Sequence, residues 1–169
     1  MELIHFSKED RIDFNRTYEQ GDIEKGGFGK PTGLWISDED SFGWSQWCRA
    51  ENFHVEHLKN AFSVKLKDNA NILHIRTVEE LDTFNETYKC PMFKNHPELS
   101  STMMTIDWEA VAGQYNGILI TPYLWERRLH MEYNFYYGWD CASGCIWNSD
   151  AIESIELIPD YELPKEEEV

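Results

Sequence analysis

Short segments of the chain alternate apolar and polar residues or form brief apolar runs rich in β-branched and aromatic side chains, a pattern typical of strands. The last of these segments, IESIELI, alternates well enough for a final strand. We predict strands over residues 2–7, 33–37, 62–66, 72–75, 117–121, 131–139 and 152–158. Together they predict a sheet of six or seven strands.

Other segments repeat apolar residues every three or four positions, which predicts helices. Residues 41–53 include Trp44, Trp47 and Phe53 at this spacing. Thr77 precedes such a segment and Glu80 follows three residues later, which is the sequence of a capping box. We therefore predict a helix from Thr77 to about residue 87, and a third from residue 105 or 107 to about 113.

The remaining segments have the composition of loops. Residues 8–32 mix charges with several glycines, residues 88–102 contain two prolines, and residues 140–149 contain Gly, Ser and Asn. Residues 159–169 include three consecutive glutamates. We expect one domain over residues 1–158, followed by an acidic, solvated tail over residues 159–169.

The net charge of the chain limits the classes of molecule that it is expected to bind. The 169 residues include 31 acidic and 15 basic ones, a formal net charge of −16. A surface this acidic repels phosphate backbones, so nucleic-acid binding is not expected. The same charge is compatible with the opposite role, in which an acidic protein imitates nucleic acid and occupies a basic groove of another protein. Seven Trp residues exclude a disordered acidic chain.

The cysteine spacing and the N-terminal residues indicate in which cellular compartment the protein is expected. The four cysteines have no C-x-x-C spacing, the first ten residues lack the regions of a secretory signal, and no apolar run reaches the length of a membrane span. We expect a reduced, cytoplasmic protein with structural thiols and no membrane association.

Six segments follow one another in an order that resembles the ADP-ribosyltransferase family, the NAD-using proteins that include bacterial toxins, poly-ADP-ribose polymerases and phage effectors. They lie between residues 3 and 158 and read LIHFS, GLWIS, SFGWSQWCRAENF, FSVKLKDNANILHIRTVEELDTF, IDWEAVAGQYNGILITPY and YYGWDCASGCIWN. The resemblance implies an α+β fold with a mixed or antiparallel split β-sheet core flanked by short helices. It also implies NAD as the substrate.

The family uses Arg-Ser-Glu or His-Tyr-Glu triads, and the matching positions here hold His5, Trp35 in place of Tyr, and Asp140. The resemblance implies that Asp140 and His5 are catalytic. A carboxylate near the nicotinamide–ribose bond can stabilise the oxocarbenium-like transition state. Asp140 also suits a turn or helix cap. Other acids that remain available are Glu109, Glu126 and Glu132.

The resemblance also implies a set of cofactor-binding residues. His5 and Ser7 would hydrogen-bond a ribose and the nicotinamide amide, the aromatic residues would stack on a ring, and a glycine would let the cofactor approach the backbone. The set consists of His5, Phe6, Ser7, Gly33, Leu34, Trp35, Ser37, Trp44 and Tyr123. The alternative for the histidine and the aromatic residues is ordinary core packing.

These residues predict an NAD-dependent mono-ADP-ribosyltransferase that modifies a macromolecule. A protein acceptor is favoured over nucleic acid because of the charge of −16. The alternatives are an acidic, non-catalytic inhibitor or nucleic-acid mimic, and a domain that retains the fold without the activity, which the Trp at position 35 would explain.

Two further motifs contain residues with possible binding chemistry. His54-Val55-Glu56-His57 contains zinc-ligand residue types, but its histidines are three positions apart instead of the four of H-E-x-x-H, so no metal site is predicted. Arg127 and Arg128 could bind a phosphate or pair with surface carboxylates, and pairing is favoured.

Overall fold

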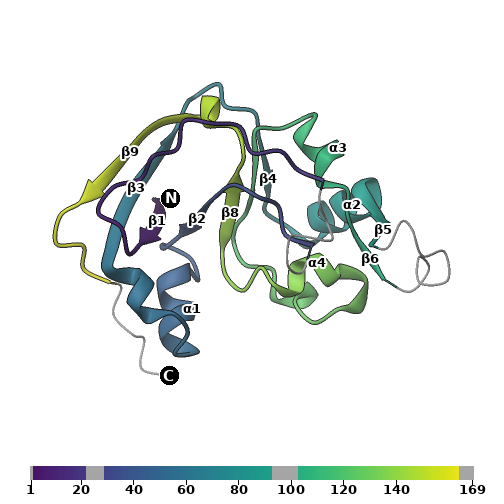
Figure 1. Ribbon diagram of the computed structural model, residues 1–169. Helices are drawn as coiled ribbons and strands as arrows, with labels where there is room; N and C mark the ends of the chain where they lie inside the picture. Colours follow the sequence, from purple (N-terminus) through teal and green to yellow (C-terminus); the bar gives the residue numbers. More distant parts are fainter. Residues whose placement is uncertain (1, 22–28, 93–102, 164–169) are drawn as a thin grey trace.

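The computed structural model describes residues 2–21, 29–92 and 103–163, and a seven-stranded sheet forms its centre (Figure 1). The strand order is β4-β7-β8-β2-β1-β3-β9, and every neighbouring pair is antiparallel except β4 and β7. The strands are β1 (Leu3–Ser7), β2 (Leu34–Asp38), β3 (Asn60–Leu66), β4 (Ile72–Ile75), β7 (Gly117–Ile120), β8 (Ser143–Ile146) and β9 (Ile152–Ile158). A separate pair consists of β5 (Lys89–Pro91) and β6 (Met104–Ile106).

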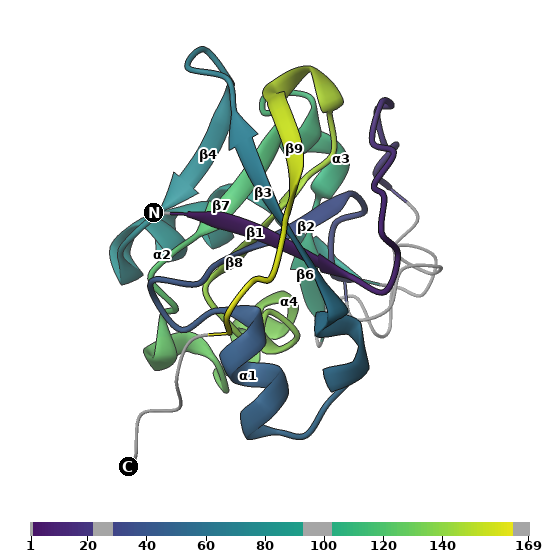
Figure 2. The same cartoon turned by 90° about the vertical axis from the view of Figure 1, so that its left-hand side faces the viewer.

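The helices are short. They are α1 (Trp44–Ala50), α2 (Val78–Tyr88), α3 (Trp108–Ala112) and α4 (Asn134–Tyr137), with 3₁₀ turns η2 (Val55–Lys59), η3 (Trp125–Arg127), η4 (Met131–Tyr133) and η5 (Ser149–Ala151). Figures 1 and 2 show α2, α3 and α4 at the end of the molecule opposite β3 and β9, with α1 apart from them. Within the described ranges no helix has the length and apolarity needed to cross a bilayer.

The predicted class, mixed α and β structure with a mostly antiparallel sheet and short helices, is confirmed. The split sheet that the family resemblance implies stays a prediction, although one ladder of the sheet is short. The β1–β2 ladder includes only the pairs Leu3–Asp38 and Ile4–Ser37, whereas β1 pairs with β3 over four residues, Ile4 to Ser7. The strands β1 and β2 therefore separate after Ile4, although the sheet remains one hydrogen-bonded series.

Strand alternation places apolar side chains on both faces of the sheet. In β7, Ile118 and Ile120 belong to the larger core cluster, which includes side chains of α2, α3 and α4, while Leu119 belongs to a smaller cluster with Leu34 and Ile146. Because successive strand residues point to opposite faces, this one strand joins both clusters.

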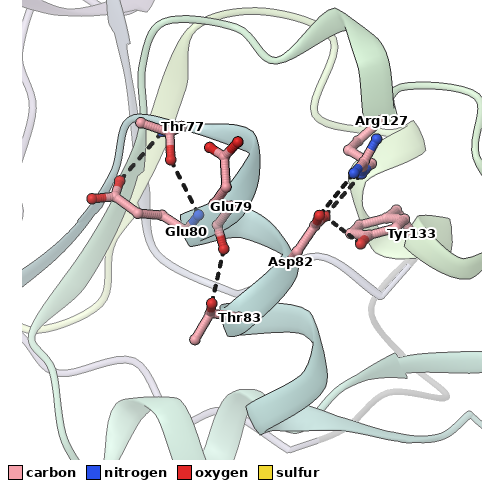
Figure 3. Close-up of polar contacts among 7 residues, drawn as sticks. All are labelled: Thr77, Glu79, Glu80, Asp82, Thr83, Arg127 and Tyr133. Atoms are coloured by element: carbon pink, nitrogen blue, oxygen red, sulfur yellow. Dashed lines mark hydrogen bonds and ion pairs between the residues drawn. The ribbon is translucent and has the colours of Figure 1, made fainter.

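Local sequence signals account for the start of α2. Figure 3 shows the predicted capping box, in which the Glu80 N–H donates to Thr77 Oγ1 at 3.2 Å and the Thr77 N–H donates to Glu80 Oε2 at 3.3 Å. Further along α2, Asp82 accepts two hydrogen bonds from Arg127, at 2.8 and 2.7 Å, and one from the Tyr133 hydroxyl. These contacts fasten the segment before α4 to α2.

Two predictions near the C-terminus are wrong. Residues 131–139 form η4 and α4 instead of a strand, because the buried aromatic residues Tyr133, Tyr136 and Trp139 recur every three positions. Residues 140–149 are not one turn but include strand β8, which lies between β7 and β2 and whose small residues permit close contact with both. A Cβ on Gly144 would lie 2.2 Å from the Ile118 carbonyl oxygen.

The other boundaries differ less. Strands β5 and β6 were not predicted, and the helix expected from residue 105 or 107 begins at Trp108, where Asp107 caps it by accepting from the Ala110 N–H at 3.1 Å. The described part of the long segment 8–32 has no strand or α-helix, only an isolated bridge from Thr17 to Asn148. Residues 22–28, 93–102 and 164–169, and so the glutamates of the expected tail, lie outside the described residues.

Candidate functional site

A cavity of about 280 Å³ opens where β1 and β2 separate. The residues that line it come from β1, the segment before β2, β2 itself, α1, η2 and the segment around β8. They are Ile4, His5, Phe6, Lys30, Trp35, Ile36, Ser37, Trp44, His57, Trp139, Cys141 and Ser143. Small-molecule sites typically measure roughly 300–1,000 Å³, so this cavity matches a ring with an attached sugar better than a complete dinucleotide.

The side chain of His5 makes a hydrogen bond to β2 beyond the point where the β1–β2 ladder ends. Its Nδ1 lies 2.7 Å from the carbonyl oxygen of Trp35, and since that oxygen can only accept, Nδ1 carries the proton and donates. Burial lowers the pKa of His5, and the hydrogen bond to Trp35 opposes this only in part. The ring is therefore neutral near pH 7, and its Nε2 is a hydrogen-bond acceptor.

Aromatic and cationic groups meet at one end of the cavity. The rings of Trp35 and Trp139 lie edge to face with centroids 4.9 Å apart, and the Lys30 ammonium lies 5.2 Å from the centroid of the Trp35 ring. Trp44 lines the same cavity and stacks on Trp47 at 5.1 Å. The cavity thus offers flat apolar surfaces beside a positive charge.

Asp140 lies next to this end, between the lining residues Trp139 and Cys141, and its Oδ2 is 4.0 Å from Lys30 Nζ. Its φ of 58° is left-handed, and the Cys141 N–H donates to the Trp139 carbonyl around it. A turn role is therefore present, as the alternative interpretation expected. Burial raises the pKa of Asp140, while Lys30 and Arg128 act in the opposite direction.

A second acid near the cavity was not predicted. Glu39, which follows β2 and precedes α1, is buried and accepts hydrogen bonds from the hydroxyls of Ser37, at 2.5 Å, and Ser45. The sequence feature that could have indicated this site is an acidic residue between a strand and a helix whose first turn contains no acid. Ser37 therefore uses its hydroxyl to hold Glu39 while it lines the cavity.

Four predicted cofactor residues lie outside the cavity lining. Ser7 accepts a hydrogen bond from the Glu9 N–H at 3.1 Å, and Leu34 belongs to the core. Gly33 faces β8, where an added Cβ would lie 2.4 Å from the Ile146 carbonyl oxygen, so its small size serves strand contact. Tyr123 is buried and stacks on Tyr136 at 5.3 Å, and its hydroxyl has no partner among the described residues.

The alternative acids lie elsewhere. Glu109, Glu126 and Glu132 are exposed and do not belong to the described lining of the cavity. Of the two arginines, Arg127 pairs with Asp82 as favoured, and Arg128 lies 5.6 Å from the centroid of the Trp125 ring.

The thiols have the character of core residues. The cysteines of the described ranges form no disulfide, and Cys48, Cys141 and Cys145 are buried. Burial, reinforced by Glu39, raises the pKa of Cys48 to about 12, and burial also raises the pKa of Cys141 and Cys145. Because the thiolate is the reactive form, these residues are not suited to nucleophilic chemistry at neutral pH.

No family model, curated protein or solved structure matches this chain. The geometry of the site is thus the basis for inferring its chemistry. Its lining offers a neutral imidazole acceptor, indole faces for stacking and the Lys30 ammonium. The half-buried carboxylate of Asp140 lies 4.0 Å from that ammonium but is not itself part of the described lining.

Proposed function

We propose that the chain cleaves the nicotinamide–ribose bond of NAD and transfers ADP-ribose to a macromolecular acceptor, with a protein favoured. One observation supports this above the others. The cavity is lined by five of the nine residues that the family resemblance assigns to the cofactor: His5, Phe6, Trp35, Ser37 and Trp44. They come from β1, β2 and α1, and the fold brings the β1 residues together with residues about 30 to 40 positions further along the chain.

The chemistry of the residues suits this reaction. Loss of nicotinamide leaves positive charge on the ribose, and a carboxylate next to that carbon stabilises the transition state more than the ground state. Asp140 is the proposed carboxylate; burial raises its pKa, and Lys30 at 4.0 Å opposes this by favouring the ionised form. His5 Nε2 would accept a hydrogen bond from a ribose hydroxyl, and Trp35 or Trp44 would stack on the nicotinamide ring.

The choice of acceptor follows from charge. A net charge of −16 opposes the approach of a phosphate-rich acceptor, so a protein side chain is favoured. Simple hydrolysis of NAD is the variant of this proposal in which water is the acceptor.

The test is release of nicotinamide from NAD by the wild type and by Asp140→Asn. Asparagine tolerates the left-handed backbone at position 140, so the turn is kept while the charge is lost. We expect release to fall by about 10²-fold or more. Asp160→Asn is the matched control, because Asp160 is also left-handed, with φ of 52°, but is exposed and outside the described lining. It should keep wild-type activity.

Binding is measured separately, by calorimetry with NAD. Asp140→Asn should still bind, whereas Trp35→Ala should bind more weakly because a stacking surface is lost. Absence of both binding and release in the wild type would refute the proposal. Strongly salt-dependent binding to a basic nucleic-acid enzyme, unchanged in Asp140→Asn, would instead support the acidic inhibitor.

A further inference from the structure

Three side chains with metal-binding atoms meet at the surface beside the cavity. His54 Nδ1 lies 3.2 Å from Glu56 Oε1, and His57 Nε2 lies 3.7 Å from the same oxygen. All three atoms lie within 4.8 Å of one another. The imidazole rings of His54 and His57 stack with their centroids 4.7 Å apart.

The local backbone explains why these residues meet despite their spacing. His54 is the N-cap of η2 and has a left-handed backbone, with φ of 45° and ψ of 37°. The His57 N–H donates to the His54 carbonyl oxygen at 2.8 Å, so a tight turn brings the two residues together. The i, i+4 spacing of H-E-x-x-H describes two histidines within one α-helix, which is not the backbone here.

The three side chains are exposed enough for an ion to reach them from solvent. The side chains of His54, Glu56 and His57 are 50%, 58% and 43% exposed, so each can rotate to optimise its distance. Lys8 Nζ lies 3.7 Å from Glu56 Oε1, but both groups are more than half exposed, and a pair of this kind is weak and easily displaced. Two imidazole nitrogens and one carboxylate oxygen form a set of ligands that zinc accepts, with water completing the tetrahedron.

We propose that His54 Nδ1, Glu56 Oε1 and His57 Nε2 bind a divalent late transition-metal ion, with Zn²⁺ as the best match. Ligand atoms at zinc distances of about 2.0–2.2 Å lie roughly 3.3 Å apart in a tetrahedral site. The separation between His54 and Glu56 is close to this value, whereas His57 Nε2 lies 3.7 Å from Glu56 Oε1 and within 4.8 Å of His54 Nδ1, so the exposed rings must move closer to bind the ion. Because His57 also lines the cavity, the ion would sit at the cavity margin.

The experiment is calorimetric titration of the full-length, chelator-treated chain with Zn²⁺. Wild type should bind one ion, and His54→Ala and His57→Ala should each weaken binding by about tenfold or more. His130→Ala is the control, because His130 is an exposed histidine outside the cluster, and its affinity should equal that of the wild type.

Circular dichroism spectra of all variants keep a folding defect distinct from the loss of a ligand, since both cluster histidines are about half exposed and their replacement should not unfold the chain. Glu56→Gln adds a second line of evidence, because it removes the negative charge with little change in shape and should also weaken binding. No binding by the wild type, or equal affinity in the wild type and in His54→Ala/His57→Ala, would overturn the proposal. Neither outcome depends on NAD, so this test is independent of the proposed enzyme activity.

Discussion

Gly144→Ala should strongly destabilise the protein, although it adds a single methyl group to a strand. Gly144 lies in β8, opposite Leu119 of β7. Its added Cβ would lie 2.2 Å from the Ile118 carbonyl oxygen, 2.4 Å from Leu119 Cδ2 and 3.0 Å from Leu119 Cα. Two of these three atoms belong to the backbone of a central strand, so they cannot turn away as a flexible side chain could.

The magnitude follows from the shift that this contact forces. The Ile118 oxygen must retreat by about 0.8 Å to reach 3.0 Å, the shortest separation that real Cβ atoms show. Overpacking of this kind costs about 1–3 kcal/mol, and weakening one β7–β8 hydrogen bond adds about 1 kcal/mol. We expect the free energy of unfolding to fall by about 2–4 kcal/mol.

The matched control is Gly113→Ala, the same chemical change at the end of α3. Gly113 has φ of −66°, and its Cβ would lie 3.4 Å from the Ala110 carbonyl oxygen, which is ordinary contact. Alanine there should leave stability unchanged or raise it by about 0.4–1 kcal/mol, because the unfolded chain loses entropy.

Urea denaturation followed by tryptophan fluorescence measures both variants. A free energy of unfolding for Gly144→Ala within about 0.5 kcal/mol of the wild type, the range of neutral surface substitutions, would refute the packing argument. Gly144→Ala should also bind NAD more weakly, because Cys141 and Ser143, which lie just before it in the chain, line the cavity.

Three further predictions concern stability. Thr77→Ala should lower the free energy of unfolding by about 1 kcal/mol because the capping box of α2 is lost, whereas Thr83→Ala, whose hydroxyl only bonds back to the Glu79 carbonyl, should not; urea titration distinguishes them. Burial lowers the pKa of His5, so below about pH 6.5 the unfolded chain gains a proton that the folded chain does not. Stability should therefore fall as the pH decreases through that value, and thermal scans of His5→Asn should show a smaller decrease. Burial raises the pKa of Asp140, so its ionisation opposes folding, and Asp140→Asn should raise the melting temperature at neutral pH but not under acidic conditions where the carboxyl is protonated.

Several elements could be predicted from the sequence because their signals are local. Strand β9 spans Ile152–Ile158 as the alternation indicated, and the capping box at Thr77 begins α2. In both, the signal lies in residues a few positions apart, so the period and the cap are visible in the chain itself, even though the ladder of β9 is formed with the distant strand β3.

Strand β8 could not be predicted in the same way. Its residues Ser143, Gly144 and Cys145 have the composition of a turn, and they form a strand because β7 and β2 lie on either side of it. Small residues are required there by the close approach of neighbouring backbones, and a sequence does not state which strands will be neighbours.

The same distinction between local and long-range signals applies to the residues of the candidate site. The sequence by itself placed His5 on a strand, Trp35 on another and Asp140 after an aromatic segment, because residue type and short-range pattern are sufficient for that. Only the tertiary structure shows that the β1–β2 ladder ends at Ile4 while β1 continues to pair with β3, that His5 donates to the Trp35 carbonyl, and that Lys30 lies near Asp140. These contacts join residues about 30 to 110 positions apart, and strand pairing with burial of the whole core determines them, since no local period encodes which distant segments will meet.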